Sequence, residues 1–228
     1  MTRQCLLIDA DDTLWENNVY FERVIDRFIA LVNHPHYTPQ QVRAVLDDIE
    51  RAHLATRGYG SLAFKLNLRD AFKTLAVDAA TPEALNELAT LAESIRQQPM
   101  QTIAGVPETL DYLAARHRLA LFTKGEPSEQ ADKLDRSGLA GFFADVRIVP
   151  EKDATTYRAM VSELDAPDGR TWMVGNSPRS DINPALEAGL KAVWVPHDLT
   201  WGLERETVAA ADDRLLVLSR FAELREHF

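Results

Sequence analysis

The sequence predicts an α/β fold with a mostly parallel sheet and an all-helical insertion after the first strand. Short apolar runs alternate with helical patterns along the second half of the chain, as in a parallel sheet covered by helices on both faces. One earlier apolar run is separated from the others by a long stretch in which only helical spacing occurs. Polar residues follow the apolar runs, at the strand ends where ligands bind in sheets of this kind.

The first strand is predicted at residues 4–8, an apolar run that leads directly into acidic residues. From residue 16 to about residue 98, the apolar residues recur at helical spacing. Within this stretch, Thr38, Pro39 and Gln41 match an N-cap, a proline at the first helical position and a capping-box partner. We therefore expect a separate helical domain between the first strand and the rest of the sheet.

The second half of the chain has a regular β–α rhythm. Strands are expected at residues 119–122, 146–149, 172–174, 192–195 and 215–218. Helices are expected at residues 107–116, 126–137, 153–164 and 184–188, with a further helix at the C-terminus. The predicted core therefore comprises residues 1–15 and 104–228, and the predicted helical domain comprises residues 16–103.

The composition argues against several classes of protein. The 228 residues carry a formal net charge of -10, which disfavours binding to nucleic acids and to anionic membrane surfaces. No apolar run approaches the ~20 residues of a membrane span, and the N-terminus does not resemble a signal peptide. The single cysteine, Cys5, lies in an apolar run and is expected to be a buried strand residue. A cytoplasmic protein fits these features.

The strongest chemical signal is the first motif, residues 9–13, with the sequence Asp-Ala-Asp-Asp-Thr. Side chains alternate between faces on an extended segment, so Asp9 and Asp11 are expected to point the same way. Two neighbouring carboxylates repel each other, and a cation or a shared proton must relieve that repulsion. This arrangement is typical of a nucleophile beside a general acid and base.

Three further motifs follow the later apolar runs in order. Thr123 ends one run, Lys152 follows the next, and the sequence Val-Gly-Asn-Ser-Pro-Arg-Ser-Asp at residues 174–181 follows the run after that. Together with the first motif, this order resembles the haloacid dehalogenase-like hydrolases, in their phosphatase branch with a helical cap inserted after the first motif. The resemblance implies a Rossmann-like catalytic core, at residues 1–15 and 104–228, and a cap, at residues 16–103.

The resemblance also implies a two-step phosphatase reaction on a small phosphorylated metabolite. Asp9 would attack phosphorus and form an aspartyl-phosphate. Asp11 would protonate the leaving oxygen and then take a proton from the water that hydrolyses the intermediate. For this work Asp11 needs a raised pKa, which we expect neighbouring carboxylates to supply.

Several positions are expected to bind the phosphate, by the same resemblance. Thr123 would donate a hydrogen bond to phosphate oxygens, and Lys152 would pair with both Asp9 and the phosphate. Thr13, the last residue of the first motif, and Lys124, which follows Thr123, are also assigned to substrate binding.

Magnesium is the cofactor that the resemblance implies. Its ligands would be Asp9, the backbone carbonyl of Asp11, and the acidic part of the fourth motif at residues 174–181. Relatives often have an aspartate where this chain has Asn176, and an amide oxygen brings no charge to the ion. Asp181 is then expected to supply the remaining carboxylate, directly or from the second coordination shell.

The cap is expected to set the specificity. Arg57 and Tyr59 lie in a glycine-containing break between helices and are candidates for contact with the leaving group, although both also fit a purely structural role. Two departures from the family pattern remain. Asp12 stands where glycine is frequent, and Asp153 stands where proline is frequent.

Four alternatives stay open. A metal-independent 2-haloacid dehalogenase or a phosphomutase of the same superfamily would also use Asp9. A phosphonate hydrolase would need a cap lysine, such as Lys65 or Lys73. A catalytically inactive phosphate-binding module would account for Asn176 as a lost metal ligand. The physiological substrate stays open, and a monomer and a homodimer are both compatible with the sequence.

Overall fold

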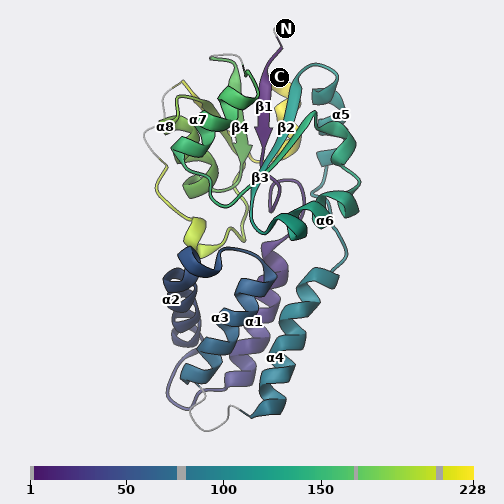
Figure 1. Ribbon diagram of the computed structural model, residues 1–228. Helices are drawn as coiled ribbons and strands as arrows, with labels where there is room; N and C mark the ends of the chain where they lie inside the picture. Colours follow the sequence, from purple (N-terminus) through teal and green to yellow (C-terminus); the bar gives the residue numbers. More distant parts are fainter. Residues whose placement is uncertain (1–2, 76–80, 167–168, 209–212) are drawn as a thin grey trace. The chain divides into compact units, whose positions relative to one another are not determined.

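A computed structural model describes residues 3–75, 81–166, 169–208 and 213–228 of the chain. The chain divides into two compact units. One unit comprises Met1–Glu16 and Met100–Phe228, and the other comprises Asn17–Pro99 (Figure 1). The first unit is an α/β structure, whereas the described part of the second contains helices and no strand.

The first unit is built on a six-stranded sheet in which all five neighbouring pairs are parallel, which confirms the predicted sheet. Its strands are β1 (Cys5–Ile8), β2 (Arg118–Lys124), β3 (Asp145–Val149), β4 (Thr171–Gly175), β5 (Lys191–Trp194) and β6 (Leu215–Val217). The order is β3-β2-β1-β4-β5-β6, so β1 lies inside the sheet between β2 and β4. Ile8 pairs with Leu121 and with Val174, which places the carboxyl ends of these three strands at one edge.

Helices cover both faces of this sheet. They are α5 (Val106–Ala114), α6 (Pro127–Ser137), α7 (Ala154–Glu163) and α8 (Asn183–Glu187). Leu6 and Ile8 pack in one apolar core with residues of α5 and α6, while Cys5 and Leu7 pack in another with residues of α7 and α8. Successive side chains of β1 therefore enter apolar cores on opposite faces of the sheet, which explains why the first run is apolar at every position.

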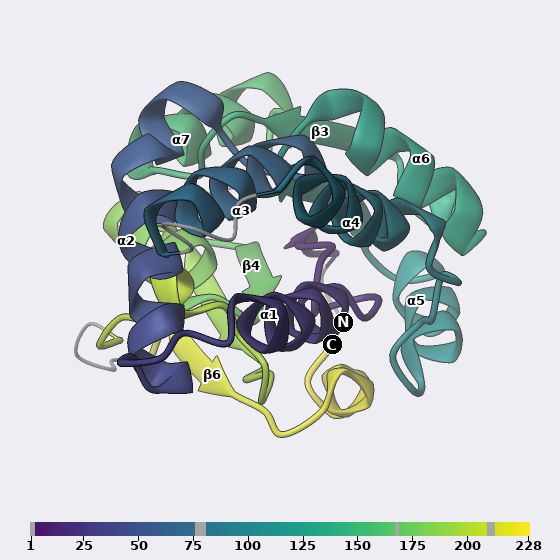
Figure 2. The same cartoon turned by 90° about the horizontal axis from the view of Figure 1, so that it is seen from below.

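The second unit contains the helices α1 (Asn18–Val32), α2 (Pro39–Arg57), α3 (Ser61–Leu75) and α4 (Pro82–Ser94). Figure 2 shows these four helices from below. They pack around a shared apolar core that includes Phe28, Leu46 and Phe72. The predicted capping box is present, because Thr38 and Gln41 exchange side-chain and backbone hydrogen bonds at the start of α2. Within the described residues, the helices fall short of the length and hydrophobicity needed to cross a membrane.

The C-terminal segment differs in detail from the prediction. A 3₁₀ helix at Phe221–Glu226 takes the place of the expected helix there. Phe221 and Leu224 are buried against the core that contains α5. The apolar spacing was therefore informative about burial, but it did not distinguish a 3₁₀ helix from an α-helix.

Candidate active site

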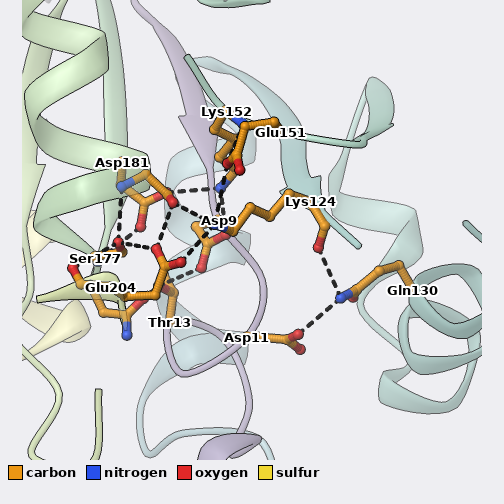
Figure 3. A network of polar contacts seen from close by, with 12 residues as sticks. Asp9, Asp11, Thr13, Lys124, Gln130, Glu151, Lys152, Ser177, Asp181 and Glu204 are labelled. Carbon is orange, nitrogen blue, oxygen red and sulfur yellow. Dashed lines mark hydrogen bonds and ion pairs between the residues drawn. The ribbon is translucent and has the colours of Figure 1, made fainter. Parts of the chain in front are cut away.

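Asp9 follows β1 directly, and its backbone N–H still donates to Val174 of β4 at 2.9 Å. Its side chain is buried at the carboxyl edge of the sheet. The ammonium of Lys152, which lies between β3 and α7, donates to Oδ1 of Asp9 at 2.5 Å. The predicted pairing of Lys152 with Asp9 is therefore present (Figure 3).

Asp181 is the third member of this charged cluster. Its Oδ1 accepts a hydrogen bond from Lys152 at 2.8 Å, and its Oδ2 accepts one from the backbone N–H of Ser177 at 2.9 Å. A Cβ atom at position 175 would collide with the Asp181 carboxylate, so Gly175 makes room for it. Asp181 lies in a π-helical turn, Pro178–Ile182, which the sequence did not predict.

The balance of charge in the cluster perturbs its acids. Burial and the neighbouring Asp181 carboxylate raise the pKa of Asp9 to about 7, although the Lys152 ammonium acts in the opposite direction. Burial alone would lower the pKa of Lys152, but the Asp181 and Asp9 carboxylates outweigh it and raise that pKa. Two carboxylates thus share one ammonium. When both are ionised, the cluster has a net negative charge that a further cation would neutralise.

We expect Lys152→Met to lower the free energy of unfolding by about 3–5 kcal/mol in EDTA, because it leaves two buried carboxylates without their shared cation. Urea denaturation at neutral pH measures this change. Arg136→Met is the matched control, since it breaks an exposed ion pair with Asp132 and should cost no more than about 0.5 kcal/mol. Equal losses in the two variants would contradict the prediction.

Oxygen atoms suited to magnesium meet beside Asp9. Thr13 Oγ1 lies 3.1 Å from Asp9 Oδ2 and 3.4 Å from Asn176 Oδ1, so these two acceptors flank one hydroxyl. A hydroxyl has a single hydrogen and cannot donate to both oxygens at once. The carboxylate and amide oxygens, together with the surplus negative charge, fit a hard divalent cation.

Asp11 does not point the same way as Asp9, which corrects the expectation from strand alternation. Figure 3 shows its side chain directed toward Gln130 and away from Asp9. The alternation fails because β1 ends at Ile8 and the chain then turns, with the backbone N–H of Leu14 bonded to the carbonyl of Ala10 at 2.8 Å. The rule of opposite faces holds only while the backbone remains extended.

The expected rise in the pKa of Asp11 is also wrong for this arrangement. Burial would raise the pKa, but the ammonium of Lys133, 2.9 Å from Oδ2, and the amide of Gln130 outweigh it and lower the pKa. The indole N–H of Trp15 adds a hydrogen bond to Oδ1 at 2.8 Å. These contacts hold Asp11 as an ionised carboxylate.

Lys124 contacts the fourth motif, and its role in substrate binding remains a prediction. Its ammonium donates to Glu204 Oε1 at 2.7 Å, to Ser180 Oγ at 2.6 Å and to Glu151 Oε1 at 3.3 Å. These three acceptors match the three hydrogens of an ammonium group. Ser177 also donates to Glu204, at 2.6 Å.

The remaining predicted residues occupy separate places. Thr123 is buried on β2, one strand from Asp9. In the helical unit, the guanidinium of Arg57 contacts Asn67 at 2.7 Å and Asp70 at 2.5 Å, and Tyr59 is half-buried. Roles of Arg57 and Tyr59 in substrate binding remain predictions.

Asp12, Glu16 and His197 form another group of potential ligand atoms, which lie within 4.8 Å of one another. The two nitrogens of His197 face different carboxylates, at 4.0 Å from Asp12 and 3.4 Å from Glu16. Asp12 has a φ of 59°, in the left-handed region that favours glycine. Aspartate also tolerates this backbone conformation, so it can stand where the family often has glycine.

Four residues near the site were missed by sequence reasoning: Gln130, Lys133, Thr200 and Glu204. Gln130 and Lys133 are three positions apart on α6, a spacing that could have marked them as neighbours on one helix face. Thr200 precedes a short 3₁₀ helix, Gly202–Glu204, that Glu204 ends, and this stretch after the last motif is too short for periodicity to indicate which side chains are buried. Asp153, the other departure from the family pattern, accepts a hydrogen bond from the Thr156 N–H at 2.7 Å and caps α7.

The family model for haloacid dehalogenase-like hydrolases matches residues 4–189. Among curated proteins, the chain is 30% identical to a phosphoserine phosphatase of Thermus thermophilus, with 98% of this chain and 97% of that protein aligned.

Solved structures give the same fold. The chain is 29% identical to a haloacid dehalogenase-like family hydrolase from Xanthomonas campestris, with a TM-score of 0.86 and coverage of 99% of this chain and 90% of that one. An L-2-haloacid dehalogenase from Xanthobacter autotrophicus, 17% identical, has a TM-score of 0.64 over 99% of this chain and 98% of its own. The latter likeness concerns the fold alone.

Proposed function

Because this chain belongs to the haloacid dehalogenase-like hydrolases, we propose that it is a magnesium-dependent phosphomonoester hydrolase with Asp9 as its nucleophile. The observation that carries the proposal is the buried pair of carboxylates, Asp9 and Asp181, on either side of Lys152. A phosphoryl group needs a nucleophile and positive charge at one place, and this cluster combines the two. The phosphatase name of a relative aligned over nearly the whole chain supports the same reaction.

The proposed reaction has two steps. A carboxylate oxygen of Asp9 forms a bond to phosphorus while the bond from phosphorus to the ester oxygen breaks. To give that oxygen its proton, Asp11 must first gain a proton and release Lys133, whose ammonium now favours the ionised form. Asp11, now a carboxylate, takes a proton from water, whose oxygen bonds to phosphorus and releases Asp9 and inorganic phosphate. Lys152 and Thr123 would hold the phosphoryl oxygens during both steps.

The metal would be held by Asp9, Asn176 and Asp181 together with the backbone carbonyl of Asp11. When bound, magnesium supplies positive charge to the phosphoryl oxygens. The chain's own contribution is to keep these oxygens buried and fixed. The Ser177 N–H and Lys152 orient Asp181, while Thr13 contacts Asp9 and Asn176.

We expect the affinity for Mg²⁺ to fall as the pH drops below about 7, because Asp9 has a pKa of about 7 and must lose its proton before it binds a cation. Isothermal titration calorimetry at about pH 6 and about pH 8, in buffers with different ionisation enthalpies, measures the affinity and the protons released. Asp9→Asn is the control, since an amide has no proton to lose in this range. A wild-type affinity that does not change with pH would contradict the assignment of Asp9 as a ligand.

The two compact units are proposed as the catalytic core and the cap. Phosphoserine is the first substrate that we propose to test, because the relative from Thermus thermophilus is a phosphoserine phosphatase. A matched phosphate ester without the amino group would show whether the amine is recognised. We also propose a cytoplasmic location and a small-molecule substrate, with no nucleic-acid or membrane partner.

The second candidate reaction is metal-independent dehalogenation, which the shared fold allows. Halide departs without protonation, so Asp11 would have no task as a general acid in that reaction. The deciding experiment measures phosphate release from p-nitrophenyl phosphate and phosphoserine, with Mg²⁺ and with EDTA, beside chloride release from 2-chloropropionate. Mg²⁺-dependent phosphate release supports the proposal. Chloride release that persists in EDTA, without phosphate release, would show that the protein is a dehalogenase and would overturn the proposed phosphatase reaction.

A further inference from the structure

We propose that Thr200 is a positioning residue that turns the amide oxygen of Asn176 toward Asp9, and so allows an asparagine to serve as a metal ligand. This inference rests on the proposed magnesium site. An aspartate presents an oxygen whichever way its carboxylate is turned, whereas an asparagine presents either an oxygen or an NH₂ group. A chain with asparagine at this position therefore needs a neighbour that selects one orientation.

The hydrogen bonds around Thr200 supply that selection. The Thr200 hydroxyl donates to the backbone carbonyl of His197 at 2.8 Å, which uses its only hydrogen. Its oxygen is then left as an acceptor, and it accepts from Nδ2 of Asn176 at 3.3 Å. Because Nδ2 faces Thr200, Oδ1 of Asn176 faces Thr13 and, beyond it, Asp9.

Without this acceptor, the opposite orientation of the amide would be favoured. The two oxygens flanking Thr13, one from Asp9 and one from Asn176, repel each other when no cation lies between them. A flipped amide would turn its NH₂ group toward the Asp9 carboxylate, which is a favourable contact but removes the metal ligand. Asn176 and Thr200 are both buried, so bulk water cannot compensate either group for a lost partner.

Thr200 is itself held in place by the segment that carries it. The Arg205 guanidinium donates to the Thr200 carbonyl at 2.9 Å. Glu204, four residues after Thr200, accepts from the hydroxyl of Ser177 at 2.6 Å (Figure 3). It also accepts from the hydroxyl of Ser180 at 2.5 Å. The segment that carries Thr200 is therefore fastened to the fourth motif through Glu204, and it can hold the amide in one orientation.

A double-mutant cycle on the full chain tests the inference, with Mg²⁺ affinity measured by calorimetry in the absence of substrate. Thr200→Val keeps the shape of the side chain and removes its acceptor, and we expect it to weaken Mg²⁺ binding by about 10–100-fold. In an Asn176→Asp background, the same change should have little effect, because either carboxylate oxygen can bind the ion. Thr200→Ser should bind as the wild type does.

Thr207→Val is the matched control, since Thr207 is an exposed threonine in the same part of the chain. Thermal unfolding in EDTA checks that each variant is folded. Equal losses of affinity from Thr200→Val in both backgrounds, or no loss in either, would overturn the inference while leaving the metal site intact. Failure of the wild type to bind Mg²⁺ would overturn the metal part of the proposed function, and this inference with it.

Discussion

Asp9→Asn is expected to lower kcat by about 10⁴-fold or more, the scale on which the loss of a covalent nucleophile slows other hydrolases. The amide keeps the shape of the side chain but cannot attack phosphorus. Lys152 still has Asp181 as a partner at 2.8 Å, so the variant should fold. The loss would therefore report on the chemistry and not on the stability of the protein.

The measurement is phosphate release from p-nitrophenyl phosphate with Mg²⁺ present, together with intact-mass analysis of the acid-quenched enzyme. The wild type should show a phosphoryl adduct during turnover, and Asp9→Asn should show none. Asp165→Asn is a control at a carboxylate outside the candidate site. Turnover in Asp9→Asn close to that of the wild type would mean that another group is the nucleophile.

Asp11→Asn is expected to separate the two roles proposed for Asp11. With an alkyl ester such as phosphoserine, the first step needs a proton donor, and we expect a loss of about 10²–10⁴-fold in kcat. With p-nitrophenyl phosphate, the leaving group departs without a proton, and only the hydrolysis of the aspartyl-phosphate should be slow. Rapid mixing should then give a burst of p-nitrophenol followed by slow turnover.

Asp132→Asn, at an exposed carboxylate on α6, is the matched control and should behave as the wild type. Equal losses with both esters and no burst would contradict the division of roles. The contacts of Asp11 with Lys133 and Gln130 favour its ionised form, which is the form that the water-activating step requires. The acid step requires a proton on the same carboxylate. The burst experiment therefore also shows which of the two steps depends on the observed contacts of Asp11 with Lys133 and Gln130.

The order of strands and helices could be predicted from the sequence because burial imposes a local pattern. Apolar runs such as that of β1, which are short and bounded by polar residues, are typical of interior strands of a covered sheet. Caps such as Thr38 are local as well, since the residues that exchange hydrogen bonds are three apart. For the same reason the motifs carrying Asp9, Thr123, Lys152 and Asp181 could be assigned to strand ends.

The sequence by itself thus determined the parallel sheet and the helical insertion, and its family resemblance implied the pairing of Lys152 with Asp9. Only the tertiary structure decided the direction of Asp11, the partners of Lys124 and the orientation of Asn176. Each of these depends on a residue distant in sequence: Lys133 beside Asp11, Glu204 beside Lys124 and Thr200 beside Asn176. Periodicity indicates which face of an element is buried, but hydrogen bonds between residues far apart in the sequence form only after the chain has folded.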